Sequence, residues 1–513
     1  MDLPPVELTP DGIAPADVIA VARADAPVTL GSDAWEAMER SAAVVADFAA
    51  SEEPKYGIST GFGALATVKI PAQKRAELQR ALIRSHAAGM GPPVEREVVR
   101  ATMLLRARTL AMGCSGARPQ LAQAFCDVLN AGITPIVPEH GSLGASGDLA
   151  PLAHCAMVLI GEGRCHDAHG AERTAADALA DAGLAPIALE AKEGLALING
   201  TDGMLGQLVL ACADIERALK TAEIAAAMSV EALLGTDRVF APDLVGLRPQ
   251  PGQALSAANL QQILAGSPIV ASHAGPDDPR VQDAYSLRCA PMVLGAARDT
   301  LAHARTTAGY ELRAAIDNPM VLADGRVESC GNFHGAPIAY VMDFLAIAIA
   351  DVGAIAERRT DRLLDRTRSH GLPPFLAHDP GVDSGLMIAH YAQAAMVAEN
   401  RRLATPASVD TIPTSAMQED HVSLGWGAAR KLRTATANLQ RIVAVELLAA
   451  ARGITLRAPL IPGPGTGAAV AAIGSPADGG PDRFLSPELA DVERLVRDGT
   501  ILEAVQTAIG ELR

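Results

Sequence analysis

The sequence predicts a mainly α-helical protein, with an N-terminal globular domain followed by a bundle of long helices. Two observations carry this prediction. Charged and apolar residues alternate at a spacing of three to four over much of the chain, which is the periodicity of amphipathic helices. Hydrophobic residues make up 49% of the 513 residues, but aromatic residues only 3%. The apolar surface is therefore mostly Ala, Leu, Val and Ile, whose small side chains allow helices to approach one another closely.

Shorter helices are predicted for the N-terminal domain, which we assign to residues 1–200. The periodicity indicates helices over residues 75–88, 94–112, 120–129 and 149–160. Residues 161–183 are rich in Gly, Asp, His and Ala, a composition typical of surface loops. The stretch is also compatible with a β-hairpin inside that loop.

Longer helices are predicted for the second domain, residues 201–513. One apolar helix is expected over residues 203–234, with Gly235 as its C-cap. Three further helical blocks are predicted over residues 283–315, 338–366 and 423–451. A helix of ~30 residues is ~45 Å long, too long for one compact globule, so we expect subunits to pack together and bury the apolar faces. Residues 461–467 are expected to form a loop.

The charge of the chain excludes one class of partner. The net charge is −16 and the pI is near 5.2, whereas nucleic-acid binding needs clustered Lys and Arg. The longest apolar run, residues 338–356, approaches membrane-spanning length, but Asp343 and Asp351 interrupt it, and charges at bilayer depth are costly. We therefore expect a buried core helix there, and no nucleic-acid or membrane partner.

The cysteines and the N-terminus indicate a cytoplasmic protein. Seven cysteines are scattered along the chain without a C-x-x-C pair, which suits free thiols in a reducing compartment. The first residues lack the positive charge and apolar core of a signal peptide. The twelve histidines form no H-E-x-x-H motif, so we expect no metal site.

The most informative segment of the chain is Gly141–His154. At its centre, Ala145, Ser146 and Gly147 are three small residues with one hydroxyl. Because Gly has no Cβ, the amide nitrogen of Gly147 can approach the carbonyl carbon of Ala145. Closing that ring and losing water, including the elements of the Ser146 hydroxyl, would give a methylidene-imidazolone. This electrophile would come from the chain itself, with no external cofactor.

Other interpretations of the same segment have to be weighed. A phosphate-binding loop is disfavoured because no GK[ST] follows and no strand pattern precedes. A serine-hydrolase elbow requires G-x-S-x-G, and Asp148 stands where the second glycine is needed. A plain Gly-rich loop before a helix accounts for the local composition equally well, so the rest of the chain has to decide.

Gly141–His154 resembles the signature of the aromatic amino-acid ammonia-lyases and aminomutases, the histidine and phenylalanine ammonia-lyase family. Further segments between residues 55 and 425 resemble the same family. The resemblance implies the electrophile formed from Ala145, Ser146 and Gly147. It also implies the same mainly α-helical plan and a homotetramer, with active sites assembled from three subunits.

The resemblance also assigns roles to residues in those further segments. Tyr56 and Tyr285 are the candidate bases, Tyr56 from a loop over the site and Tyr285 from a position that reaches the α- or β-carbon of the substrate. Tyr285 and Arg288 lie three apart on one helical face, and Arg288 can hold an α-carboxylate bidentately. Gln282 is expected to bind substrate as well.

Two more residues are placed around the electrophile by the resemblance. Asn199 is expected to hydrogen-bond the oxygen of the electrophile or the substrate, although an Asn here is otherwise typical of a helix cap. Phe333 is expected to pack against the electrophile, which is compatible with an ordinary core position.

The residues at the far end of the pocket indicate which substrate is bound. Phenylalanine-specific members of the family show Phe-Leu and tyrosine-specific members His-Leu, where this chain has Ser85-His86 as histidine-specific members do. Gln418-Glu419-Asp420 likewise matches the histidine-specific pattern. A carboxylate at Glu419 can pair with an imidazole, whereas a phenyl ring would leave it buried and unpaired, which is costly.

The resemblance therefore implies non-oxidative deamination of L-histidine to trans-urocanate and ammonia, the first step of histidine degradation. A phenylalanine or tyrosine ammonia-lyase, or an aminomutase, on the same scaffold is the alternative. A non-catalytic helical scaffold is a third hypothesis, and the intact Ala145, Ser146 and Gly147 speak against it. The sequence does not decide which tyrosine is the base or whether His86 is protonated.

Overall fold

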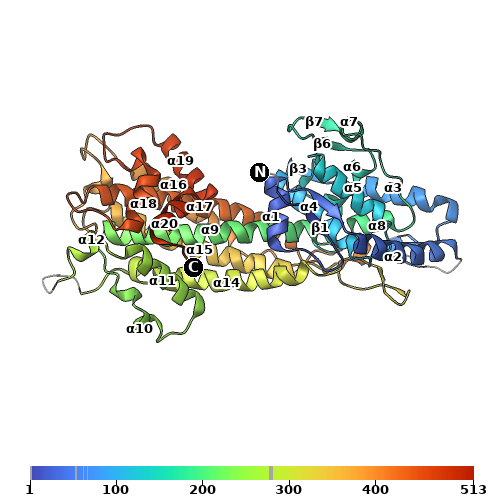
Figure 1. Cartoon of the computed structure of the whole chain (residues 1–513), viewed down its shortest axis with the longest axis horizontal. Coiled ribbons are helices and arrows are strands. Elements are labelled where there is room, and N and C mark those ends of the chain that lie inside the picture. The colour runs from blue at the N-terminus through green and yellow to red at the C-terminus, as the bar shows by residue number, and fades with distance from the viewer. Residues whose placement is uncertain (1–2, 52–54, 62, 66, 276–280) are drawn as a thin grey trace. The chain divides into compact units, whose positions relative to one another are not determined.

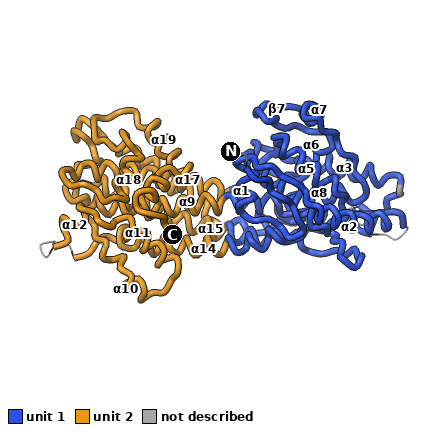
Figure 2. Tube along the Cα trace, in the orientation of Figure 1, with its two compact units in different colours: residues 1–210, 305–342, 406–430 blue, residues 211–304, 343–405, 431–513 orange. Residues whose placement is uncertain are grey.

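The structure is a computed structural model that describes residues 3–51, 55–61, 63–65, 67–275 and 281–513. It confirms the mainly α-helical fold (Figure 1). The chain forms two compact units, each discontinuous in sequence (Figure 2). Unit 1 comprises residues 1–210, 305–342 and 406–430, and unit 2 comprises residues 211–304, 343–405 and 431–513. The division of the chain into domains at residue 200 stays a prediction.

Unit 1 contains the shorter helices expected from the first part of the sequence. These are α1 (Pro15–Ala24), α2 (Ser32–Ala50), α3 (Arg75–His86), α4 (Arg96–Ala111), α5 (Pro119–Asn130), α6 (Leu149–Leu159), α7 (Ala175–Asp181) and α8 (Glu193–Ile198). Helix α4 is the core of the unit, since every residue from Val98 to Ala111 is buried. Its buried Arg100 donates hydrogen bonds to the carbonyl oxygens of Val21 and Leu129, which offsets the cost of burying a guanidinium.

Short strands and short 3₁₀ helices accompany these helices in the described part of unit 1. Strands β1 (Val6–Leu8) and β2 (Val28–Leu30) pair in parallel, whereas β3 (Met90–Pro93) pairs antiparallel with β5 (Pro138–His140). Strand β4 (Thr134–Pro135) extends the hairpin of β6 (Arg164–His166) and β7 (Glu172–Thr174). That hairpin agrees with the loop and hairpin expected over residues 161–183, but residues 175–181 of the same stretch form helix α7 rather than loop. Strands β8 (Met320–Val321) and β9 (Val327–Glu328) form a further pair.

Unit 2 is built from the long helices and the C-terminal helices. The long ones, parts of which also belong to unit 1, are α9 (Asp202–Ala232), α14 (Ala290–Glu311), α15 (Ala336–Leu364) and α17 (Gly425–Thr455). The shorter ones are α10 (Pro242–Val245), α11 (Pro251–Leu264), α12 (Pro268–Ala271), α13 (Tyr285–Arg288), α16 (Met387–Leu403), α18 (Pro464–Ile473), α19 (Leu485–Asp498) and α20 (Thr500–Ile509). Ser229, Arg359 and Glu446 join α9, α15 and α17 through buried hydrogen bonds.

Three details of the predicted elements differ in the structure. The predicted helix over residues 283–315 is two helices, because the chain leaves helical geometry at Cys289 between α13 and α14. The predicted loop over residues 461–467 ends early, because Pro464 occupies the first position of α18, where its missing N–H costs nothing. Helix α9 ends at Ala232, and Leu234 rather than a glycine adopts the left-handed conformation beyond it, with a φ of 52°.

Two apolar helical stretches are long enough to cross a membrane by length and composition. They are Glu193–Ala232 and Ala336–Leu364, and 100% and 61% of their most apolar windows are buried within the protein. Such burial is typical of core helices, because a helix that is apolar all round has to be covered. The predicted core helix over residues 338–356 lies within the second stretch.

Candidate active site

The segment Gly141–Asp148 links β5 to α6 and is pressed against a second turn of unit 1. Gly147 has a φ of +77°, which L side chains rarely adopt. A Cβ at this position would overlap the carbonyl oxygen of Gly200. The same carbonyl oxygen accepts a hydrogen bond of 2.6 Å from the amide of Asp148. Position 147 therefore has room for backbone alone, which is what ring closure onto residue 145 requires.

Four helices have their N-terminal ends at this loop, and all four of these ends belong to unit 1. Helix α6 follows it directly, and the carboxylate of Asp148 accepts a 2.8 Å hydrogen bond from the amide of Met204 in the first turn of α9. Immediately before α15, the amide of Gly335 donates to the carbonyl oxygen of Gly144 over 3.3 Å. Immediately before α17, the amide of Leu424 donates to the carbonyl oxygen of Leu143 over 2.8 Å. Because the N-terminus of a helix carries partial positive charge, the loop lies in a field that favours negative charge.

Asp148 connects the loop to α9 from a completely buried position. Burial raises the pKa of this carboxyl to about 7, against hydrogen bonds from Met204, Ser142 and Gly203 that lower it. The hydroxyl of Ser142 donates to the second carboxylate oxygen over 2.8 Å. The side chain thus fixes the loop on both sides of Ser146.

Two neighbouring cavities of unit 1 meet at Ser146. The larger has a volume of about 650 Å³ and is lined by Tyr56, His86, Ser146, Asn199 and Glu419, together with apolar side chains of α3, α6 and α8. The smaller has a volume of about 460 Å³, and Tyr56, Ser146 and Glu419 line it too. Ala145 and Phe333 also line the smaller cavity. The structure therefore brings together the electrophile segment and five of the side chains that the sequence singled out.

Glu419 reaches Ser146 from a tight turn over residues 414–419. The backbones of Thr414 and Glu419 pair in both directions, over 2.9 and 3.3 Å. The Thr414 hydroxyl donates to Oε2 of Glu419 over 3.1 Å. The Ser146 hydroxyl donates to Oε1 of Glu419 over 3.4 Å. Oε2 of Glu419 is thus oriented by the turn that carries the residue, while Oε1 accepts the hydrogen bond from Ser146.

His86 is the last residue of α3 and is half-buried. Its Nδ1 lies 2.9 Å from the carbonyl oxygen of Leu82, and because a carbonyl oxygen only accepts, Nδ1 carries the proton. Burial lowers the pKa of His86, while the Leu82 carbonyl and the charge of Glu419 act in the opposite direction. Burial thus favours the neutral imidazole, and in that form Nε2 is a hydrogen-bond acceptor.

Asn199 is 2% exposed and follows α8. Its Nδ2 donates to the carbonyl oxygen of Asn318 over 2.9 Å. Its Oδ1 is buried without a hydrogen-bond partner among the described residues. A buried acceptor of this kind is costly unless a donor reaches it, so the site fits a ligand that carries an N–H group.

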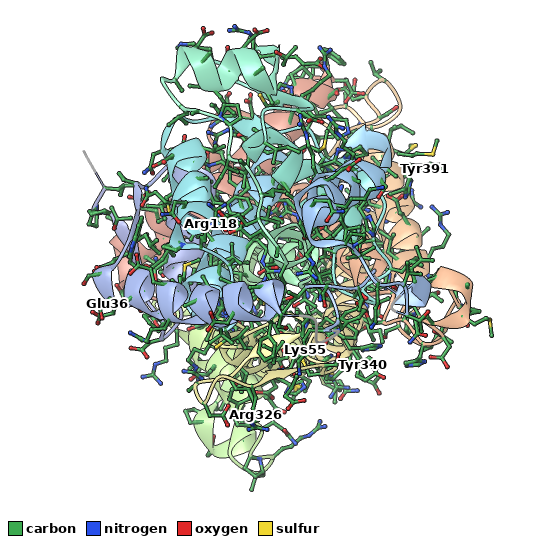
Figure 3. All side chains as sticks on the ribbon, turned by 90° about the vertical axis from the view of Figure 1, so that its right-hand side faces the viewer. Glu36, Lys55, Arg118, Arg326, Tyr340 and Tyr391 are labelled. Carbon is green, nitrogen blue, oxygen red and sulfur yellow. The ribbon has the colours of Figure 1, made fainter. Side chains whose placement is uncertain are left out.

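Tyr56 lies on a short loop that lines both cavities and is anchored by its neighbours in sequence. Ile58 is fully buried, in a cluster with Val45, Val321 and Val327. Lys55, labelled in Figure 3, places its ammonium 4.8 Å from the centre of the Phe48 ring at the end of α2. The Tyr56 hydroxyl accepts a 3.1 Å hydrogen bond from the amide of Gly63. Position 62, in the same loop, lies outside the described residues.

The remaining predicted site residues belong to unit 2. The structure does not bring them together with Ser146 and the side chains that line its two cavities. Tyr285 and Arg288 lie on α13, with the Arg288 guanidinium carbon 4.7 Å from the centre of the Tyr285 ring. Tyr285 is 72% exposed. The Nε of Arg288 is buried without a partner among the described residues. Gln282 lies three residues before α13 and is exposed.

Sequence reasoning missed a buried ion pair beside the cavities. The ammonium of Lys192 lies 2.7 Å from a carboxylate oxygen of Asp317, and both side chains are 0% exposed. The other Asp317 oxygen accepts from the amide of Asn318, the residue that holds Asn199 and lines both cavities. The sequence gives no sign that Lys192 folds against residues 317–319.

The described residues contain no group of three or more His, Cys, Asp or Glu side chains that could hold a metal ion.

Comparisons with known proteins agree over nearly the whole chain. The aromatic amino acid lyase family matches residues 13–475. A curated relative named histidine ammonia-lyase, from Streptomyces avermitilis, is 61% identical over 98% of each chain. Another of the same name, from Gloeobacter violaceus, is 48% identical over 97% of this chain and 96% of its own.

Solved structures give the same fold. A histidine ammonia-lyase from Trypanosoma cruzi superposes with a TM-score of 0.90 at 37% identity, covering 98% of this chain and 96% of its own. A tyrosine aminomutase from Streptomyces globisporus superposes with a TM-score of 0.93, also at 37% identity, over 99% of this chain and 100% of its own. Fold similarity alone therefore does not separate these two activities.

Proposed function

The chain belongs to the aromatic amino acid lyase family, and on that premise we propose that it removes ammonia from L-histidine to give trans-urocanate. This is the first step of histidine degradation. The observation that carries the choice of substrate is the pair of His86 and Glu419 lining the same cavity as Ser146. Curated relatives 46–61% identical over nearly the full length, all named histidine ammonia-lyase, support the same conclusion.

We infer that Ala145, Ser146 and Gly147 form the methylidene-imidazolone, so that no external cofactor is needed. One feature of the site fits that group: position 147 has no room for a Cβ, so the backbone of Gly147 alone occupies the space where the ring closes. The group would supply an electrophilic carbon that takes up the substrate amine and makes ammonia a better leaving group.

The neutral His86 and the carboxylate of Glu419 are proposed to bind the substrate imidazole. The Nε2 of His86 accepts from an imidazole N–H, and Glu419 pairs with the other side of the ring. A phenyl ring offers neither contact. It would cover the half-buried carboxylate without giving it a further hydrogen-bond donor, which is costly. This logic favours histidine over phenylalanine.

The remaining roles follow the chemistry of the side chains. Arg288 binds the α-carboxylate bidentately, and Gln282 assists in holding the substrate. Tyr56 or Tyr285 removes the β-proton. Phe333 packs against the electrophile and keeps its face dry, and Asn199 accepts from the substrate amine.

We propose that the subunits assemble into a homotetramer, and that Gln282, Tyr285 and Arg288 reach the Ser146 group of a neighbouring subunit. Large side chains are exposed along α15 and α16, among them Phe344 at 49%, Ile388 at 63% and Tyr391 at 69%. Tyr391 lies at the outline of the molecule in Figure 3. Apolar exposure on this scale is typical of surfaces that bind other proteins. The exposed ring of Tyr285 is explained in the same way.

A cytoplasmic location is proposed from the thiols. None of the seven cysteines, all of which lie within the described residues, forms a disulfide, and four of them are buried. Free thiols are typical of proteins in a reducing compartment.

Incubation with L-histidine tests the proposed function directly. Urocanate absorbs in the ultraviolet, so its appearance follows the reaction, and ammonia release should match it mole for mole. Phenylalanine and tyrosine, at the same concentrations, should react far more slowly. A preference for phenylalanine or tyrosine, or conversion of an α-amino acid to its β-isomer, would favour the alternative activities of the family.

A second experiment tests the electrophile. The wild-type protein should be lighter than its encoded mass by two water molecules, whereas Ser146→Ala should fold and assemble but lose nearly all activity. A wild-type protein at its full encoded mass would contradict the proposal.

A further inference from the structure

We propose that Glu419 catalyses the loss of water from Ser146 that forms the electrophile, in addition to its proposed role in binding the substrate. The inference deepens the proposed function, since it concerns the same site. It depends on the chain forming the methylidene group but not on which amino acid is the substrate.

The carboxylate of Glu419 is positioned on the group that must leave. The Ser146 Oγ lies 3.4 Å from Oε1 of Glu419 and donates to it. Oε2 is held by the Thr414 hydroxyl at 3.1 Å, and the paired backbones of residues 414 and 419 fix the turn. The carboxylate is therefore directed at Ser146 before any substrate is bound.

Two other carboxyls lie close in sequence to the two partners, and their surroundings differ. Asp148 is 0% exposed and accepts hydrogen bonds from Ser142 and from the amide of Met204, so both of its oxygens are engaged away from Ser146. Asp420 is exposed. Glu419 is the carboxyl that the structure places in contact with the Ser146 hydroxyl.

The chemistry balances without an oxidant or reductant. Ring closure forms the bond from the Gly147 nitrogen to the Ala145 carbonyl carbon. It releases the carbonyl oxygen as water, with one hydrogen each from the nitrogens of Gly147 and Ser146. In the second dehydration the Cα–H of Ser146 gives its proton to the Glu419 carboxylate, and the Cβ–Oγ bond breaks. The carboxyl then passes the proton to the departing oxygen, which leaves as the second water, and Glu419 is again a carboxylate.

The surroundings favour this step for a separate reason. Loss of the Cα proton places negative charge on the new ring, and the starts of α6, α9, α15 and α17 all meet the loop that carries it. The positive ends of helices stabilise such charge. Cα and Oγ of one serine are separated by a single carbon, so one carboxylate can serve both.

Glu419→Gln tests the proposal through mass rather than turnover. Glutamine keeps the size of the side chain but cannot carry the proton between Cα and Oγ. The variant should retain the Ser146 hydroxyl, since loss of general acid–base catalysis slows such a step by about 10²–10⁴-fold. The readout is the mass of the intact protein and of the peptide containing residues 145–147, purified without substrate.

Three further proteins complete the design. Asp420→Asn, which changes the adjacent exposed carboxylate, should lose both waters as the wild type does. Glu419→Asp keeps a carboxylate, so its second dehydration should proceed, but slowly, over time. Thr414→Val removes the hydrogen bond that orients Oε2, and it should raise the fraction of chains that keep the hydroxyl even if Glu419→Gln fails to fold.

The outcomes are separable. Complete loss of two waters in Glu419→Gln, at the wild-type rate, would overturn the proposal, as would unchanged maturation in Thr414→Val when Glu419→Gln does not fold. A wild type that loses both waters but leaves histidine unchanged would contradict the proposed function and leave the role of Glu419 in maturation intact.

Discussion

Among single residues, Gly147 is under the tightest steric constraint in the site. Its positive φ and its contact with Gly200 are independent reasons why no other residue fits. A matched comparison exists at Gly170, in the turn of the β6–β7 hairpin. There φ is +80°, and a methyl group in place of the Cα hydrogen would have no atom of the described residues within 4 Å. A comparison of substitutions at the two positions therefore separates the cost of backbone strain from the cost of steric overlap.

Gly147→Ala should therefore cost much more stability than Gly170→Ala. Alanine at a positive φ costs about 1 kcal/mol or somewhat more at either position. At position 147 the methyl group also displaces the turn at Gly200, so activity and loss of water should both fail. Thermal unfolding and intact mass of the two variants test this, and equal melting temperatures would contradict it.

The buried carboxyl of Asp148 makes the stability of the folded protein depend on pH. The folded chain holds a proton on this carboxyl up to about pH 7, whereas an unfolded aspartate loses its proton near pH 3.9. The folded state thus binds more protons between these values, and the stability that Asp148 contributes is full below about pH 3.9 and is lost as pH rises through 7.

The melting temperature of the wild type minus that of Asp148→Asn should fall as pH is raised from about 4 to 7. Over this range the wild type loses the stability linked to the proton on Asp148, whereas the asparagine does not titrate. Ser142→Ala serves as the control, because it removes a hydrogen bond to Asp148 but leaves the titrating group. A difference that does not vary with pH in Asp148→Asn would contradict the assignment.

The residues of the site were predictable where chemistry is local in sequence. Ala145, Ser146 and Gly147 are adjacent, so their reactivity can be inferred from the residues themselves. Asn318 and the pair of Lys192 with Asp317 could not be found in this way. Their role depends on a contact between residues 125 positions apart, and neither neighbourhood carries a pattern that indicates it.

At the level of elements, α13 is a four-residue helix that carries both Tyr285 and Arg288. Its backbone is held by Arg359 of α15, whose Nη1 donates to the carbonyl oxygen of Ser286 over 3.3 Å. Two other nitrogens of the same guanidinium bind Glu446 of α17 over 2.5 and 2.8 Å. One buried side chain thus ties the short helix to two long ones.

Arg359→Lys should lower kcat/KM for histidine about tenfold or more, because one ammonium cannot make all three contacts and a lost hydrogen bond to a charged group is worth about 1.5–3 kcal/mol. A displaced α13 should raise KM through Arg288 and lower kcat through Tyr285. Arg358→Lys is the matched control, since that side chain is 59% exposed. A lower melting temperature with unchanged kcat and KM would mean that Arg359 is structural alone.

Helix positions were predictable from periodicity, and helix ends were not. The helices over residues 75–88, 94–112 and 120–129 were found to within two residues at either end. Burial of one face sets the pattern of α3 and α5, whereas α4 is buried on every side over residues 98–111. The break at Cys289 escaped prediction because the apolar pattern continues across it. Pro291, the second residue of α14, is the local signal that could have indicated it, since proline is typical of the first turn of a helix. The start of α18 was hidden by the Pro and Gly residues around it, which are equally typical of loops.

At the scale of the whole molecule, the proposed site needs residues from both units. Mixed oligomers test whether they come from different subunits. Ser146→Ala keeps Arg288, and Arg288→Lys keeps Ser146, so each variant alone should be nearly inactive. If each centre takes these residues from two subunits, co-expression of the two variants produces some centres with both encoded residues.

Co-expression should therefore restore a measurable fraction of wild-type turnover of histidine. Mixing the two purified variants, without subunit exchange, should restore none. Absence of recovery in oligomers that native mass spectrometry identifies as mixed would place Ser146 and Arg288 of each centre in a single chain.

The meeting of four helix starts at one loop has a consequence for when the protein can mature. Residues 143 and 144 are held by groups that follow them by almost 200 to 280 positions, at Gly335 and Leu424. During synthesis, the loop leaves the ribosome long before those partners exist. A chain released before residue 425 is therefore expected to keep both waters. A protein that has lost the mass of two waters must have been synthesised beyond that point and must have folded its distant segments against the loop.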